Sequence, residues 1–147
     1  MPGSRFELRL DVKPWMSFLL CILLLTLPVT WLAAWLVSVA VHELGHLLML
    51  RILSIPVYAV IVGLGGIRIE TAPMAPGQEL LCALAGPMAG CLLVRFGRWF
   101  PLAAVFAFVH TAWNLLPIGN SDGARALRSL WAFVRKIPCK QTRERLQ

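Results

Sequence analysis

A long apolar run near the start of the chain carries the stretch His42-Glu43-Leu44-Gly45-His46. No Asp, Glu, Lys or Arg occurs between Lys13 and Glu43. On a helix, residues four apart lie on one face, so both imidazoles can reach one metal ion while Glu43 lies beside them. Ionisable groups within apolar spans are costly and usually functional. The spacing therefore predicts a metal site. The alternative is that these side chains only hydrogen-bond to one another or to a neighbouring helix.

The composition around this stretch is that of an integral membrane protein. Of the 147 residues, 59% are hydrophobic, whereas soluble domains contain about 45–50% apolar residues. The net charge is +7, but seven of the fourteen basic residues follow Asp122, beyond the last apolar run. We interpret them as determinants of membrane orientation and lipid contact, not as a nucleic-acid surface. The four cysteines show no paired spacing and predict neither a disulfide framework nor a zinc ribbon.

The apolar segments predict about four transmembrane helices. As one helix, Pro14–Leu53 would be about 60 Å long, twice the roughly 30 Å hydrocarbon core, so we divide it into two spans near Pro28. A third span is expected from about Glu79 to Val94 and a fourth from Trp99 to Ile118. If Pro14–Leu53 crossed only once, three spans would remain.

Between the second and third spans the sequence changes character. Two β-rich runs, Val57–Val62 and Ile67–Glu70, flank a glycine-rich turn that includes Gly65 and Gly66. The second run alternates apolar and charged residues, which favours a strand with one wet face. We therefore predict a mainly α, polytopic membrane protein with a short β-hairpin. An ordinary connecting loop is the alternative reading of this segment.

The ends of the chain predict its orientation. Residues 124–147 are basic, and apolar residues recur at helical spacing from Leu127 to Val134. This pattern is typical of an amphipathic helix on anionic lipid, and a solvated tail is the alternative. The positive-inside rule then places residues 1–13 and the tail in the cytoplasm. The site is expected toward the cytoplasmic side with either three or four spans. We expect residues 1–147 to form one membrane-embedded domain.

A catalytic zinc ion commonly has three protein ligands, so His42 and His46 need a partner. The third histidine of the metzincin motif is absent, because Ile52 stands at its position. The acidic candidates downstream are Glu70, Glu79, Asp122 and Glu144. Asp122 is preferred because it follows an apolar span and the helix-breaking Pro117. Its alternative role is a helix cap, since Asp is a favoured N-cap residue.

Three motifs together resemble the signatures of the site-2 protease family of intramembrane zinc metalloproteases. They are His42–His46, Ala85-Gly86-Pro87, and Asn114-Leu115-Leu116-Pro117 followed by Asp122-Gly123. Their order and spacing match over roughly Trp31 to Arg125, and the short chain most resembles the compact bacterial sporulation-type branch. Two positions depart from the family pattern. Gly90 stands where Asn is usual, and Ala124 stands where a second Gly is common.

The resemblance implies an enzyme, a zinc metalloendopeptidase of the bacterial cytoplasmic membrane. It would cleave a membrane-associated protein and release a cytoplasmic regulatory fragment. It implies that His42, His46 and Asp122 bind Zn²⁺ and that Glu43 is the catalytic base. It also implies that Asn114 helps to position the substrate or the developing oxyanion. Gly65 and Gly66 are further candidate substrate contacts, because an edge of the Val57–Glu70 hairpin could accept an extended substrate strand.

Two questions stay open from the sequence. His110 lies one helical turn before Asn114, where it could either face the zinc site or be a buried histidine satisfied by a backbone carbonyl. The alternative function is a non-catalytic zinc-binding membrane scaffold or regulator, although the intact Glu43 argues against it. A small channel or transporter subunit would explain buried polar groups but not their metal-ligand spacing.

Overall fold

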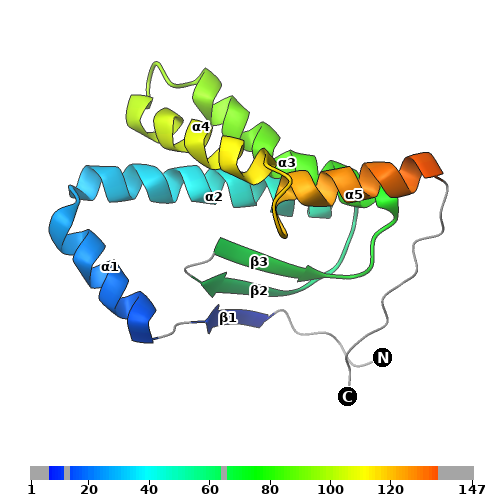
Figure 1. Ribbon diagram of the computed structural model, residues 1–147, viewed down its shortest axis with the longest axis horizontal. Helices are drawn as coiled ribbons and strands as arrows, with labels where there is room; N and C mark the ends of the chain where they lie inside the picture. The colour runs from blue at the N-terminus through cyan, green and yellow to red at the C-terminus, as the bar shows by residue number, and fades with distance from the viewer. Residues whose placement is uncertain (1–6, 12–13, 64–65, 136–147) are drawn as a thin grey trace.

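The computed structural model of the protein describes residues 7–11, 14–63 and 66–135. These ranges are mainly helical and include one small sheet (Figure 1). In chain order the elements are β1 (Glu7–Asp11), α1 (Pro14–Thr26), α2 (Val29–Ile52), β2 (Val57–Gly63), β3 (Gly66–Thr71), α3 (Pro76–Arg95), α4 (Pro101–Leu115) and α5 (Asp122–Arg135). The predicted mainly α architecture, with a hairpin between the second and third helices, is confirmed.

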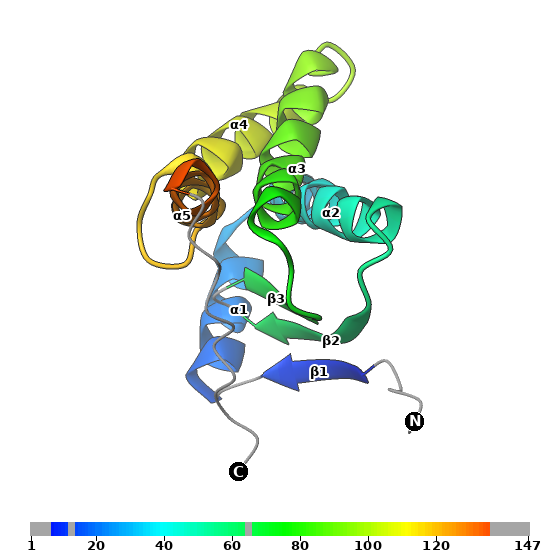
Figure 2. The same ribbon diagram turned by 90° about the vertical axis from the view of Figure 1, so that its right-hand side faces the viewer.

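Helices α2, α3 and α4 pack together, and α5 lies against α3 (Figures 1 and 2). Proline residues set several of their ends. Pro28 precedes α2, while Pro76 and Pro101 occupy the first turns of α3 and α4, where a missing N–H costs no helical hydrogen bond. Helix α4 ends at Leu115, two residues before Pro117. The three helices that carry the predicted motifs are therefore neighbours.

Two helices, α2 and α3, are long and apolar enough to cross a membrane. Helix α4 is apolar but has 15 residues, about 22 Å of helix, and α1 has 13 residues, about 20 Å. Both are shorter than the roughly 30 Å hydrocarbon core. The four predicted crossings are thus not shown, and the structure supports two.

The core of the helix bundle consists mostly of small side chains. Buried positions on α3 and α4 are largely Ala and Gly, whereas Trp, Phe and Leu side chains on these helices point outward. Gly45 shows why: a Cβ atom there would lie 2.8 Å from Ala89 Cβ, so α2 and α3 approach closely. Small residues inside and large apolar residues outside are characteristic of helix packing in a membrane. The distribution indicates a membrane protein.

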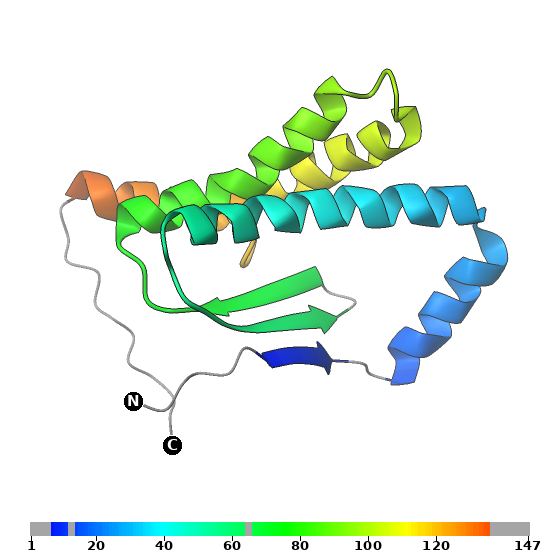
Figure 3. The same cartoon turned by 180° about the vertical axis from the view of Figure 1, so that it is seen from behind.

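The sheet has the order β1-β2-β3. The antiparallel β2–β3 pair is the predicted hairpin, and in β3 Arg68 and Glu70 are exposed while Ile67 and Ile69 are partly covered. Strand β1 was not predicted. It pairs in parallel with β2, with Glu7 opposite Ala59 and Asp11 opposite Gly63. The strands run alongside α2, with β3 nearest to the helices (Figures 1 and 3).

Candidate metal centre

The three predicted ligands meet at one point between α2 and the start of α5. Asp122 Oδ2 lies 2.9 Å from His42 Nε2 and 3.1 Å from His46 Nε2, and the two nitrogens are 3.3 Å apart. The ligand atoms of a tetrahedral zinc site, with bonds of about 2.0–2.1 Å, are about 3.3 Å apart. All three residues are buried. The cluster therefore has the dimensions and the ligand types of a zinc site.

The orientation of His46 is fixed by the backbone of α3. His46 Nδ1–H donates a hydrogen bond of 2.8 Å to the carbonyl oxygen of Cys82. In the neutral ring, Nε2 then carries a lone pair, and that lone pair faces the carboxylate oxygen of Asp122. Two acceptors at this distance repel each other unless a proton or a cation lies between them. The donor set thus fits a bound cation.

Gly86 on α3 leaves room beside the ligand atoms. A Cβ atom at this position would lie 2.7 Å from His42 Nε2 and closer still to His46 Nε2. Real Cβ atoms do not make such contacts, so only glycine allows the helix to pass here. The small-residue motif Ala85-Gly86-Pro87, which predicted close helix approach, therefore borders the metal centre itself.

Asp122 reaches the histidines because another residue caps α5. The N–H of Ala124 donates to Ser121 Oγ over 3.2 Å, so Ser121 is the capping residue. This leaves the Asp122 carboxylate free to turn toward α2. Helix α5 is outside the candidate membrane spans. Burial alone raises the pKa of Asp122, but hydrogen bonding to His42 and His46 outweighs it and holds this pKa well below its usual range.

His110 and Asn114 lie beside the cluster on α4. The His110 ring stands perpendicular to the His42 ring, with centroids 4.7 Å apart. Asn114 Nδ2 is 3.1 Å from both His110 Nε2 and the His110 carbonyl oxygen. Asn114 therefore orients the His110 side chain next to a predicted ligand. The roles of both residues remain predictions.

The other predicted site residues are placed less closely. Glu43 is half-buried on α2 and directly follows His42. Gly66 begins β3, the strand nearest to the helices (Figure 1). Gly65 lies outside the residues that the structure describes. The substrate contacts implied for the two glycines remain predictions.

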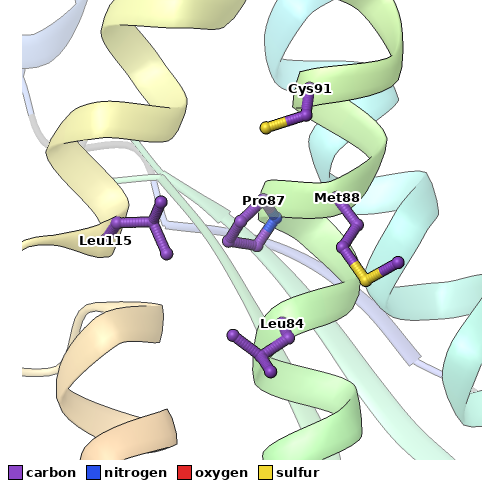
Figure 4. Close-up of a pocket in the computed structure, with 5 residues that line it drawn as sticks. All are labelled: Leu84, Pro87, Met88, Cys91 and Leu115. Carbon is purple, nitrogen blue, oxygen red and sulfur yellow. The ribbon is translucent and has the colours of Figure 1, made fainter.

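Two surface pockets flank the helices near the site. The larger one, of about 370 Å³, is apolar and lies between α3 and the end of α4 (Figure 4); it is lined by Leu84, Pro87, Met88, Cys91 and Leu115. The smaller one, of about 180 Å³, lies between α2 and α4 and is lined by Trp35, Phe106, Val109, His110 and Trp113. Both pockets border the metal centre, the larger one through Pro87, which follows Gly86, and the smaller one through His110, whose ring packs against that of His42.

Several contributors to the site were missed from the sequence. The hydrogen bond of His46 uses the backbone of Cys82, and a backbone acceptor leaves no signature in residue type. Arg125 lies 3.8 Å from both Asp122 and Glu79. The sequence does contain a signal for Arg125, because a basic residue three positions after Asp122 lies on the same face of the helix. In the sequence-based interpretation, Arg125 is treated only as part of the basic tail.

The comparisons with known proteins bear on the fold. No family model and no curated protein matches the sequence. The structure is similar to that of the site-2 protease from Methanocaldococcus jannaschii, with a TM-score of 0.63 and 18% sequence identity. The match covers 81% of this chain and 63% of that chain, so this chain spans less than two thirds of its neighbour. Nothing in the comparison points to the sporulation-type branch. The chain has the fold of a site-2 protease, as its three motifs predicted.

Proposed function

We propose that the chain is an intramembrane zinc endopeptidase of the site-2 protease family. The observation that carries this proposal is the convergence of His42, His46 and Asp122 on one point, where their ligand atoms lie within 3.3 Å of one another. Glu43 directly follows His42 in the sequence. The protein fold supports a protease, and the donor set supports a metal ion. The substrate would be a membrane-associated protein, whose cleavage releases a cytoplasmic regulatory fragment.

In this proposal His42, His46 and Asp122 hold the zinc ion, and Gly86 keeps the space beside it free of side chains. A bound zinc ion lowers the pKa of water toward about 7 and polarises a carbonyl group. The Glu43 carboxylate accepts a proton from the attacking water and later donates it to the leaving amine. Asn114 orients His110 beside the ligands and is available to contact the substrate.

The membrane arrangement is part of the proposal. Helices α2 and α3 would cross the bilayer, while the shorter α1 and α4 would complete four spans by local thinning of the bilayer. The basic residues of α5 and of the tail would lie on the cytoplasmic side of a bacterial membrane, together with both termini and the site. Labelling of cysteines introduced in α5 with membrane-impermeant reagents, in sealed vesicles of each orientation, tests this arrangement.

The decisive experiment compares the native protein with Glu43→Gln. Both proteins are purified and analysed for zinc, and each is co-expressed with a candidate membrane substrate. We expect about one zinc ion per chain in both and cleavage only by the native protein. Loss of the base should lower the rate by at least about 10²-fold.

The same experiment separates the alternatives. Zinc in both proteins, without cleavage of any membrane substrate by either, would favour a zinc-binding scaffold or regulator. Absence of bound metal in the native protein would refute the proposed protease. Equal cleavage by both proteins would remove Glu43 from the catalytic role.

A further inference from the structure

The two oxygens of the Asp122 carboxylate face different partners. Oδ2 points to the two imidazoles, at 2.9 and 3.1 Å. Oδ1 lies 3.8 Å from Arg125 Nη1, one turn along α5. The carboxylate is buried, whereas the Arg125 side chain is 29% exposed at the edge of the site. One oxygen is thus directed at the metal position and the other at a cation of the protein.

Arg125 also forms an ion pair with a second carboxylate. Its Nε lies 3.8 Å from Glu79 Oε1, on the first turn of α3. Arginine can serve both partners because its planar guanidinium carries donors on Nε and on both terminal nitrogens. A lysine ammonium is a single point charge and lacks this fork. The ion pairs of Arg125 with Glu79 and with Asp122 therefore link α3 to the metal centre through α5.

The charge of Arg125 also matters for the acidic side chains around it. Asp122 and Glu79 flank it, each with a carboxylate oxygen 3.8 Å from a guanidinium nitrogen. Without Arg125, both carboxylates would lose an ion-pair partner. A freed Asp122 carboxylate could then rotate and offer both oxygens to the metal.

We propose that Arg125, held by Glu79, is a positioning residue that keeps Asp122 a one-oxygen ligand. The proposal rests on the zinc site of the proposed function. Neither Arg125 nor Glu79 is assigned a contact with substrate or with the metal. Groups that orient a metal ligand typically contribute a factor of 10 to 100 in metal affinity.

Zinc affinity of the purified full-length protein, measured by competition with a chelator, tests the proposal without any substrate. We expect Arg125→Gln to weaken zinc binding by about 10- to 100-fold and Glu79→Gln to weaken it less. Arg125→Lys should fall between Arg125→Gln and the native protein. Arg128→Gln is the matched control, because Arg128 is exposed on the same helix and should leave affinity unchanged.

Two further readouts separate positioning from a general loss of structure. In a double-mutant cycle, Glu79→Gln should add nothing to Arg125→Gln, because Glu79 acts only through Arg125. X-ray absorption of the zinc-loaded proteins should show one additional oxygen ligand in Arg125→Gln. Thermal unfolding of the metal-free variants identifies any that fail to fold. If Arg125→Gln fails to fold, Glu79→Gln and Arg125→Lys test the proposal in its place.

Native zinc affinity in both Arg125→Gln and Glu79→Gln would overturn the proposal. So would additive effects of the two substitutions, or an unchanged number of oxygen ligands in Arg125→Gln. These outcomes are distinct from failure of the proposed function, which is judged by cleavage. A native protein that binds zinc tightly but cleaves nothing would refute the protease and still allow Arg125 to position Asp122.

Discussion

At Gly86 the backbone of α3 passes directly beside the two imidazoles. A Cβ atom there would lie 2.7 Å from His42 Nε2 and closer to His46 Nε2, so one methyl group must displace at least one ring. We expect Gly86→Ala to lower zinc affinity by at least about 100-fold, since losing one of three ligands removes much of the binding free energy. Zinc content and chelator competition measure this effect.

A second glycine of α3 supplies the control for this substitution. Gly77 lies in the first turn of the same helix, and a Cβ atom there would meet nothing within 4 Å. Gly77→Ala should therefore bind zinc like the native protein, with equal or slightly greater stability. If Gly86→Ala bound zinc with native affinity, the metal position could not lie beside α3.

At the scale of single elements, the contact between α3 and α4 requires a small residue at position 90. A Cβ atom at Gly90 would overlap the hydroxyl of Thr111 on α4. This hydroxyl is buried and finds no hydrogen-bond partner among the described residues. Gly90 on α3 and the larger Thr111 on α4 are therefore complementary in size.

We expect Gly90→Ala to destabilise the protein by about 1–3 kcal/mol, the usual cost of overpacking. Thr111→Ala should be nearly neutral, because it removes an unsatisfied hydroxyl. The double variant should recover most of the loss, since the new methyl group then meets only ordinary contacts, with the Cβ of residue 111 at 3.4 Å and the Ala107 carbonyl oxygen at 3.8 Å. Thermal unfolding of the four proteins in detergent measures the coupling, and additive effects would contradict it.

The elements that the sequence predicted are those with continuous local signals. Apolar runs, one divided at Pro28 and another ending near Pro117, predicted the helices, and alternation in Ile67–Glu70 predicted the outward face of β3. Strand β1 escaped prediction because its five residues pair with β2, about fifty positions away. Such pairing depends on tertiary contacts that local propensity does not encode.

Only part of the candidate site could be predicted from the sequence. The His42–His46 spacing follows from helix geometry, and Asp122 could be selected because a proline-ended span precedes it. The capping of α5 by Ser121, which frees Asp122, depends on side-chain rotamers that the sequence does not specify. The link from Arg125 to Glu79 depends on how α5 packs against α3.

At the scale of the whole molecule, the sheet and the helix bundle together limit where a substrate of the proposed protease would bind. A helical substrate hides its carbonyl groups in hydrogen bonds, so it must become extended before cleavage. Adding it as a strand to a sheet edge would hold it in that form. Strand β1 covers one edge of the hairpin, which leaves the outer edge of β3 for this purpose. That edge is the one nearest to the helices (Figures 1 and 2).

We therefore expect prolines in β3 to impair cleavage by the proposed protease. The N–H groups of successive β3 residues point alternately toward β2 and toward the outer edge of the sheet. Of the substitutions Arg68→Pro and Ile69→Pro, one therefore removes an N–H that faces β2 and the other removes an N–H that faces the outer edge. The substitution that removes the outward-facing N–H should lower kcat/KM about fivefold or more, which is the effect of losing a hydrogen bond of about 1 kcal/mol. It should not change the zinc content. Prolines at Leu8 and Arg9 of β1 are the controls, because that outer edge faces away from the helices (Figure 2). Native cleavage by both β3 variants, with the fold intact, would show that the substrate does not bind at this edge.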